Sequence, residues 1–318
     1  MQSQVQRLIA ARIGLALLTL LLVSAVVFII TSLLPGDAAQ EALGQAATPA
    51  AVAALRHKMG LDEPGLQRYL EWLFHLVTGN FGVSLSNNSP VGKLIASRMP
   101  NTLMLAGLTA VVSIPLALVI GIGAAMFRGS LVDRALNVIT LATVAVPEFL
   151  VATIAVLIFA VNLHWLPALS YLSNVHSFGG MLRIYALPVM TLCCVLVAQM
   201  SRMSRAAVLD QLDSPYVEMA ILKGASPVRI VIWHVLPNTI GPIANAIALS
   251  MSYLFGGVVI VESIFNYPGL ASLMVDAVTN RDMPLVQGCV MVFCGTYLLL
   301  VLFADVAQII SNPRLRQR

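Results

Sequence analysis

The sequence predicts an all-α membrane protein with six transmembrane helices. Hydrophobic residues make up 59% of the 318-residue chain and charged residues only 10%, whereas soluble domains carry about 25% charged residues. The apolar residues gather in long blocks that are almost free of charge, each close to the roughly 20 residues that a helix needs to cross a bilayer. Because backbone groups that face lipid must be hydrogen-bonded within their own segment, we expect these blocks to be helices.

Six segments are long and apolar enough to cross a membrane. They are residues 13–34, 102–126, 136–160, 184–204, 240–261 and 285–310. The first follows Arg7 and Arg12 and could be mistaken for a secretory signal. Its uncharged run from Ile13 to Gly36 is longer than the roughly 7–15 residues of a signal's apolar region, and five more segments follow it. We therefore expect the first segment to remain as an anchor.

Basic residues between the segments predict the orientation, because short cytoplasmic loops are enriched in Lys and Arg. The opposite short loops hold only Arg183 and Arg281. Both termini are therefore expected in the cytoplasm. The basic residues assigned to the cytoplasmic side are Arg7, Arg12, Arg128, Arg134, Arg202, Arg205, Lys223, Arg229, Arg314, Arg316 and Arg318.

The large first loop, expected in the periplasm, carries helix signals of its own. Thr48-Pro49 is an N-cap followed by proline at the first helical position, and Leu66 to Val77 forms a second apolar stretch before Gly79. A small cap without a partner and a docking surface both fit this loop. The sequence thus divides into residues 1–100, an anchor with its loop, and residues 101–318, a core of five helices.

Several classes of function are disfavoured. The four cysteines lie inside predicted spans and the five histidines are scattered without metal-ligand spacing, so we expect no metal site and no bound cofactor. No glycine-rich phosphate loop precedes a lysine, so ATP hydrolysis would need another chain. The basic residues follow the topology and do not indicate nucleic-acid binding. The absence of an internal repeat weighs against a secondary transporter built from matched halves.

The cytoplasmic loop at residues 205–239 predicts two short helices joined by a rigid turn. Ser214-Pro215 and Ser226-Pro227 are helix starts, Gly224 can take the left-handed conformation that ends a helix, and Pro237 is expected to end the second one. The loop is also unusually apolar, so its side chains must be buried by a partner protein or by the chain's own helices. These apolar residues are Val217, Met219, Ala220, Ile221, Ile230, Val231, Ile232 and Trp233.

The same loop resembles the EAA loop of binding-protein-dependent ABC importer permeases. The resemblance lies in Glu218-Met219-Ala220, in Gly224 four residues after Ala220, and in Leu236-Pro237. Met219 replaces an alanine of the general pattern and His234 replaces an isoleucine. With Leu236 and Asn238, His234 gives the form that looks like the peptide-permease branch.

Further short stretches resemble that branch along the whole chain, in the same order. The chain is most similar to the B-type subunit of dipeptide and oligopeptide importers, in a branch that also contains nickel, opine and glutathione systems. The stretches are Leu34-Pro35-Gly36-Asp37, Met59-Gly60-Leu61-Asp62-Glu63-Pro64, Phe81-Gly82-Val83-Ser84, Pro90-Val91, Arg98-Met99-Pro100-Asn101-Thr102-Leu103 and Asn312-Pro313-Arg314-Leu315-Arg316.

The resemblance implies a type I importer permease in the bacterial inner membrane, forming half of a path for short peptides. Its partners would be a related permease, two ATPases that bind ATP and Mg, a periplasmic or lipid-anchored solute-binding protein, and membrane lipid. Residues 213–237 would couple to the ATPases. In this reading Glu218, Ala220 and Gly224 shape the coupling element, whereas Ala225, Ser226, Pro227 and Arg229 approach the ATPase.

Polar residues inside the spans are candidates for the path. Glu148 follows Pro147 within a span, where a charge is costly, and a helix would place Ala145, Ala152 and Ala155 on its face. Lining the path and acting as a buried strut are both open for Glu148. Asn245, Ser252 and Gly256 form a polar, small stripe that could line the path or pack helices, and Asp305 is expected to pair with a cytoplasmic arginine.

Two other classes of function remain as alternatives to an ABC permease. A self-sufficient secondary transporter or channel would move its substrate without ATPases. A membrane scaffold would tolerate disruption of the loop at residues 205–239.

Overall fold

A computed structural model describes the chain except for residues 1, 34–46, 59–61, 172–176 and 312–318. The stretches Leu34-Pro35-Gly36-Asp37 and Asn312-Pro313-Arg314-Leu315-Arg316, and the residues 59–61, lie outside the described part. Within it the secondary structure is helical, apart from an isolated bridge between Val83 and Pro90. The elements are α1 (Gln2–Leu33), α3 (Pro49–Lys58), α4 (Gly65–Val77), α5 (Val91–Met126), α6 (Leu131–Ala145), α7 (Glu148–Ala155), the π-helix η2 (Val156–Asn162), α8 (Phe178–Leu212), α9 (Pro215–Leu222), α10 (Pro227–Ile230), the π-helix η4 (Val231–Val235), α11 (Leu236–Ile264), α12 (Leu270–Thr279) and α13 (Met283–Ser311).

Five helices of the described chain are long and apolar enough to cross a membrane, and a bent pair, α6 with α7–η2, brings the number to six where it is counted as one broken span. The prediction of one continuous helix over residues 136–160 was wrong, because α6 and α7–η2 meet at an angle of 100°. Proline disfavours the helical conformation of the residue before it, and Val146 is accordingly extended, with φ −84° and ψ 127°. Pro147 then caps α7.

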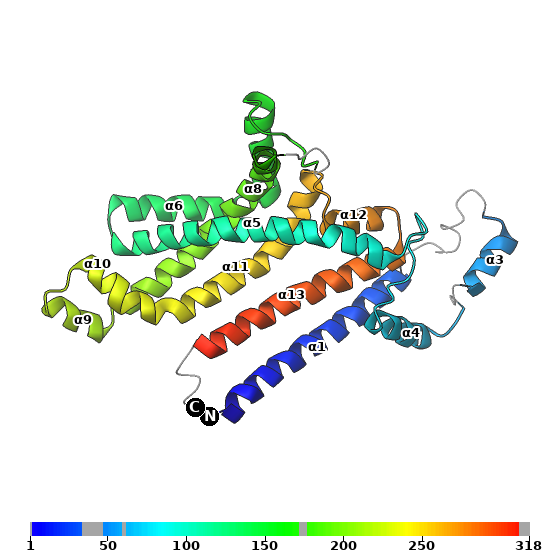
Figure 1. The fold of residues 1–318 in the computed structure, drawn as a ribbon, viewed down its shortest axis with the longest axis horizontal. Helices are drawn as coiled ribbons and strands as arrows, with labels where there is room; N and C mark the ends of the chain where they lie inside the picture. The colour runs from blue at the N-terminus through cyan, green and yellow to red at the C-terminus, as the bar shows by residue number, and fades with distance from the viewer. Residues whose placement is uncertain (1, 34–46, 59–61, 172–176, 312–318) are drawn as a thin grey trace. The chain divides into compact units, whose positions relative to one another are not determined.

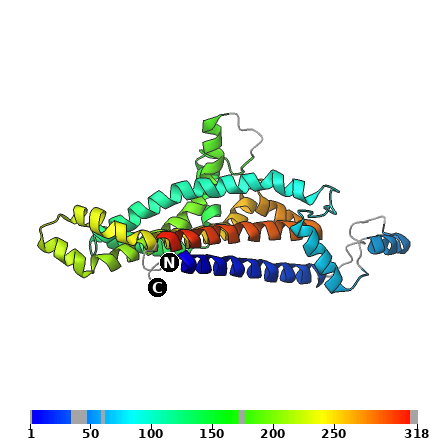
Figure 2. The ribbon, with the colours of Figure 1, turned by 60° about the horizontal axis from the view of Figure 1, so that its bottom comes forward.

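The chain forms two compact units, and several long helices contribute to both. The first unit comprises Met1–Ile13, Leu103–Tyr267 and Leu299–Arg318. Its core lies where α5, α7, α8 and α11 pack, around Leu187, Val258 and Phe265. Figures 1 and 2 show α8 and α11 running side by side. Because a Cβ on Gly121 would lie 2.6 Å from the carbonyl oxygen of Ser201, α5 can approach the backbone of α8 only with glycine there.

The second unit comprises Gly14–Thr102 and Pro268–Leu298. Its core contains Val91, Leu270 and Cys289. The buried carboxylate of Asp282 accepts hydrogen bonds from the side chains of Ser84 and Ser86. Burial raises the pKa of Asp282, but hydrogen bonds from Ser84 and the two residues after it outweigh this effect and hold the pKa below its usual value. This carboxylate fixes the loop before α5 to the start of α13.

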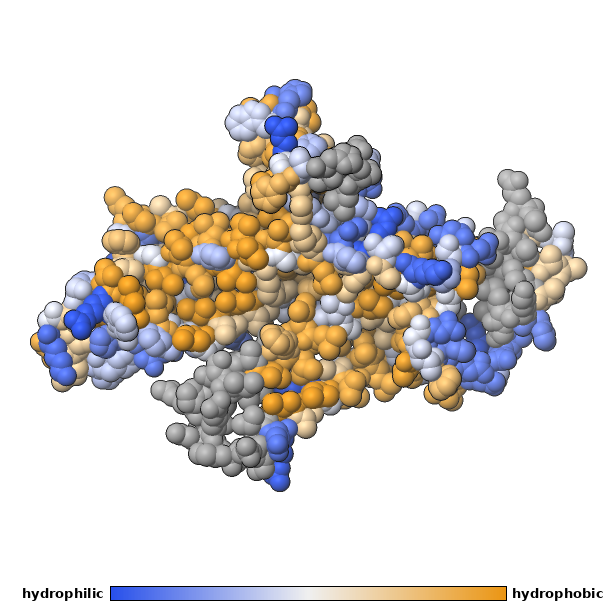
Figure 3. Space-filling model, viewed as in Figure 1, coloured by the Kyte–Doolittle hydropathy of each residue, from blue (hydrophilic) through white to orange (hydrophobic). Residues whose placement is uncertain are grey.

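Many large apolar side chains lie on the surface, as expected for spans in contact with lipid. The apolar face over α5 and α6 is visible in Figure 3. Val111 on α5 is 71% exposed and Val138 on α6 is 67% exposed. In water such a surface would be unfavourable, so lipid or a partner protein must cover it.

Candidate functional site

The loop between α8 and α11 connects these two helices at one end of the first unit (Figure 1). Two serines in extended conformation precede its two helices, with ψ 148° at Ser214 and 151° at Ser226. Each is followed by a proline at the start of the helix, where the missing N–H costs nothing. The predicted helix starts and the short first helix, α9, are therefore confirmed.

The turn at Gly224 ends α9 through a double hydrogen bond. Gly224 has φ +78°, and its N–H donates to the carbonyl of Ile221 at 2.8 Å while the N–H of Ala225 donates to the carbonyl of Ala220 at 3.1 Å. This pattern is the Schellman motif, which satisfies the last carbonyls of a helix and is commonly accompanied by an apolar contact across the turn. The turn therefore holds α9 and α10 at a defined angle.

The prediction that Pro237 ends the second helix was wrong. The chain runs from Pro227 to Ile264 as one continuous helix of 38 residues, through the π-helical segment η4. Proline inside an α-helix clashes with the carbonyl four residues earlier and cannot donate to it. A π-helical turn changes this pairing, so η4 lets the helix pass through Leu236-Pro237 and enter α11 without a break.

The apolar side chains of the loop divide into a buried and an exposed set. Val217, Ala220, Ile230 and Val235 pack against Val208 of α8 and the adjoining end of α5. The second set points away from the chain. Its members and their exposed fractions are Met219 55%, Ile221 58%, Leu222 81%, Val228 53%, Ile232 51% and Trp233 73%. Burial under the chain's own helices is thus confirmed for half of the eight predicted apolar residues, and burial of the exposed half by a partner protein stays a prediction.

Two ion pairs join the base of the loop to the turn between α5 and α6. Arg205 of α8 donates to both carboxylate oxygens of Asp133 at 2.8 and 2.9 Å. Asp133 is only 4% exposed and also accepts the N–H of Gly129 at 3.0 Å. Arg128 pairs with Asp213, which caps the C-terminal end of α8, at 2.9 Å. These contacts fix the loop's starting direction.

The predicted coupling residues all lie in this one loop. Glu218, Gly224 and Arg229 are exposed, as are Ser226 and Pro227. Ala220 is buried and Ala225 is partly buried in the packing under the loop. Among the described residues, neither Glu218 nor Arg229 has a hydrogen-bonding or charged partner for its side chain. The loop therefore presents an apolar surface with opposite charges that are free to meet another protein.

Glu148 occupies a different place from the one its spacing suggested. It begins α7, so Ala145 belongs to α6 beyond the 100° bend, and the expected face shared with Ala145 was wrong. Ala152 and Ala155 do share its helix and are buried. Glu148 lies against α11 at Gly257, where a Cβ would be 2.7 Å from its Oε2. It has no hydrogen bond or ion pair with another described residue.

The remaining path candidates are not gathered around Glu148. Asn245 and Ser252 are both partly buried on α11, and the hydroxyl of Ser252 donates to the carbonyl of Ala248 at 3.1 Å. At about 100° per residue, Ser252 is turned by roughly 140° around α11 from Gly257. Asp305 of α13 pairs with Arg12 of α1 at 3.0 Å.

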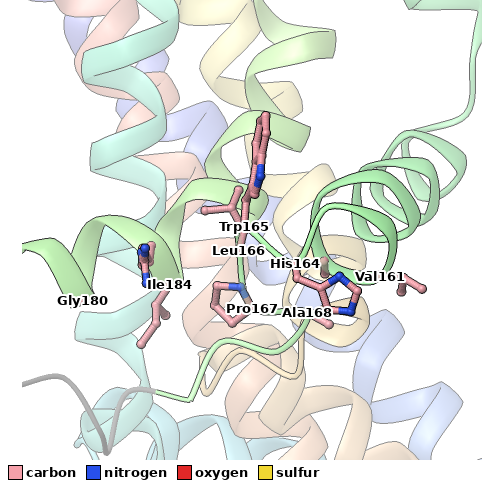
Figure 4. Close-up of a pocket in the computed structure, with 10 residues that line it drawn as sticks. Val161, His164, Trp165, Leu166, Pro167, Ala168, Gly180 and Ile184 are labelled. Carbon is pink, nitrogen blue, oxygen red and sulfur yellow. The ribbon is translucent and has the colours of Figure 1, made fainter.

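A pocket of about 550 Å³ opens at the other end of α8, between the end of η2 and the start of that helix. His164, Trp165 and Arg183 are its polar and aromatic lining residues, and Figure 4 shows the rings of His164 and Trp165 around it. None of the predicted path residues lines this pocket. Within the described part of the chain, no group of three or more His, Cys, Asp or Glu side chains could hold a metal ion.

Comparison with protein families covers most of the chain. The family described as binding-protein-dependent transport system inner membrane component matches residues 117–317, and the N-terminal model of the same systems matches residues 5–106. The chain belongs to this permease family. Its fold is accordingly that of a type I importer permease, and the loop at residues 213–237 lies inside the larger match.

Relatives of this permease are similar over nearly their whole length. A probable peptide ABC transporter permease of Sinorhizobium fredii is 35% identical, over 91% of this chain and 93% of its own. A putative peptide transport system permease of Brucella abortus is 33% identical, over 97% and 98%. The glutathione transport system permease GsiC of Salmonella choleraesuis is 34% identical, over 94% and 95%.

Membership in the family shows which kind of protein complex the permease belongs to. It is a multi-pass membrane protein and a transport component of an ABC importer, a system that also includes ATPase and solute-binding components. The sequence identified the loop of this permease but missed the Asp133–Arg205 pair beneath it. Arg128 and Arg205 were interpreted only as basic residues that mark the cytoplasmic side of the membrane. A signal was present, since Ser130 and Asp133 are spaced as a helix cap, and Ser130 Oγ accepts the Asp133 N–H at 3.2 Å.

Proposed function

We propose that this permease is the B-type subunit of a peptide importer in the bacterial inner membrane, with both termini in the cytoplasm. It forms half of the translocation path together with a related second permease. The division into residues 1–100 and 101–318 separates its anchor and outer loop from the five-helix core. Two cytoplasmic ATPases and a periplasmic or lipid-anchored solute-binding protein complete the transporter.

The observation that carries the proposal is the rigid loop with an exposed apolar surface. Its turn is fixed by the Schellman motif at Gly224 and its base by the Asp133–Arg205 pair. A rigid loop transmits the movement of a docked ATPase to the membrane helices, whereas a flexible one would absorb it. ATP and Mg bind to the ATPases, and this chain acts without catalysis of its own.

Short peptides are the cargo that the relatives' names support best, and glutathione, itself a tripeptide, is the second candidate because of GsiC. The test is reconstitution of the full transporter in liposomes with each solute as competitor: di-, tri- and longer peptides, glutathione and nickel. We expect ATP-dependent peptide uptake that requires the binding protein. Uptake by this chain alone under an ion gradient would instead identify a secondary transporter.

The Glu148 carboxylate is proposed to meet the free amino group of the cargo. Glu148→Gln is expected to weaken uptake of peptides with a free amino terminus about 10- to 100-fold, because a charge-assisted hydrogen bond contributes roughly 1.5–3 kcal/mol. Uptake of the same peptides with an acetylated amino terminus should not change. Kinetics of both peptide forms in the reconstituted transporter measure the difference.

Adjacent glycines on α11 provide a matched control for this prediction. Gly257→Ala would displace the Glu148 carboxylate, whereas a Cβ on Gly256 meets nothing within 4 Å. We expect Gly257→Ala to reproduce the Glu148→Gln effect and Gly256→Ala to behave like the original protein. If free and acetylated peptides were taken up with equal kinetics in Glu148→Gln, Gly257→Ala and Gly256→Ala alike, Glu148 would have a structural role only.

A further inference from the structure

Helix α4 presents two apolar faces, and the chain covers only one of them. Tyr69 and Trp72 pack on Phe28 of α1, with ring centroids 5.4 and 5.8 Å away. The hydroxyls of Tyr69 and Ser24 are hydrogen-bonded at 2.9 Å. Arg68 lies over the Phe28 ring at 5.8 Å. These contacts fix α4 to the side of α1, within one compact unit.

The uncovered face is a continuous stripe along the whole helix. Its residues are spaced by three and four positions, which places them on one side of a helix. They are Leu66 72%, Leu70 55%, Phe74 67% and Val77 80% exposed. At about 100° per residue, Glu71, His75 and Arg68 lie roughly 60–120° beyond the edge of the stripe at Phe74, and Gln67 borders the stripe. The apolar arc of α4 is therefore wider than the part that α1 covers.

The position of α4 along α1 shows what surrounds this stripe. α1 supplies a membrane span of 28 residues that ends at Leu33. At ~1.5 Å per residue, Ser24 and Phe28 lie about 14 and 8 Å before that end. The hydrocarbon core is about 30 Å thick, so that a helix entering it near Ile13 leaves it near Leu33. The contacts that hold α4 are thus at the depth of the lipid acyl chains.

We infer that α4 is an in-plane membrane helix whose stripe of Leu66, Leu70, Phe74 and Val77 is embedded in the leaflet at the C-terminal end of α1. Interfacial helices bury an apolar face about 5–10 Å into the boundary between headgroups and acyl chains and keep a polar face in water. The exposed, charged Asp62 and Glu63 precede the helix and keep its start in the headgroup region.

The stripe is therefore assigned to lipid, which fills the hydrocarbon layer around α1, and the experiment below distinguishes lipid from a transmembrane helix of another subunit. The inference needs only the membrane location of α1 and is independent of the cargo. Embedded in this way, α4 fixes the depth of α1 and the height of the first loop above the membrane.

Spin labels on α4 test the inference in the complete transporter, held in nanodiscs of phosphatidylcholine and phosphatidylglycerol. The native cysteines Cys193, Cys194, Cys289 and Cys294 are first replaced by alanine, and single cysteines are then placed at 70, 74, 71 and 75. Oxygen partitions into lipid and a nickel chelate into water. We expect high oxygen and low nickel accessibility in Leu70→Cys and Phe74→Cys, and the reverse in Glu71→Cys and His75→Cys.

Two reference positions calibrate the result. Leu21→Cys on α1, where leucine is 49% exposed, reports lipid, and Glu63→Cys reports water. High nickel accessibility at 70 and 74 would place α4 in water and overturn the inference. Low accessibility to both reagents would show that protein covers the stripe, and this result would also overturn the inference. Peptide uptake by each labelled variant confirms that the transporter remains folded.

Discussion

Gly224→Val is expected to abolish coupled transport while the permease still inserts and assembles in the membrane. Gly224 has φ +78°, a conformation that costs an L-residue about 1–2 kcal/mol and is a steric outlier for a β-branched one. A penalty of this size lowers the population of the native turn roughly 5- to 30-fold. The Schellman hydrogen bonds would be lost, and α9 and α10 would no longer move as one body.

A control substitution at another glycine separates the effect of backbone strain from the effect of disrupting the loop. Gly79, which ends α4 with the same pair of hydrogen bonds, has φ +81°, and a Cβ on either glycine meets nothing within 4 Å. Gly79→Val therefore introduces the same strain outside the loop and should retain uptake. Gly224→Asn should retain part of it, since asparagine tolerates the left-handed conformation. Normal ATP-dependent uptake and ATPase binding in Gly224→Val would contradict the coupling role.

Asp133→Asn is expected to cause the largest loss of stability. The Asp133 side chain is 5% exposed and that of Arg205 is 23% exposed, so the substitution leaves an arginine without its counter-charge in a mostly buried site. Breaking a buried pair from one side costs about 3–5 kcal/mol. For a chain of this size that corresponds to a lower midpoint of thermal unfolding by on the order of 10 °C.

The four free cysteines supply the measurement, because two are buried and two are partly buried. Reaction with a thiol-reactive dye in detergent reports their exposure as the protein unfolds. Asp213→Asn removes the same charge from the Arg128 pair, whose side chains are 57% and 64% exposed, and an exposed pair contributes less than about 1 kcal/mol. Similar shifts for both variants would show that the Asp133 pair does not stabilise the base of the loop.

The sequence predicted local features best where one residue type satisfies one backbone requirement. The two Ser-Pro pairs and Gly224 predicted the helix starts and the turn of the loop between α8 and α11, because proline and glycine restrict or permit conformations independently of packing. The six apolar segments likewise depended on length and composition alone. The family comparison and the helix lengths agree with this prediction.

The predictions from the sequence failed where the same residue type is compatible with two different backbone structures. A 100° bend lies at Pro147, whereas the helix continues through Pro237, next to the π-helical segment η4, and no composition pattern separates the two cases. The face assigned to Glu148 failed for the same reason, since its partners depended on an unbroken helix. Spacing also could not divide the apolar loop residues into those that pack on Val208 and those that remain exposed.

The unbroken helix from Pro227 to Ile264 has a mechanical consequence. Its 38 residues span about 57 Å at ~1.5 Å per residue, from the tip of the coupling loop past the contact between Gly257 and Glu148. A tilt of about 10° at the tip, pivoting there, would sweep the far end sideways by roughly 10 Å over this length. In the transporter proposed above, such a helix would act as a lever between the ATPase and the level of Glu148, with the π-helical turn at Val231–Val235 between the two.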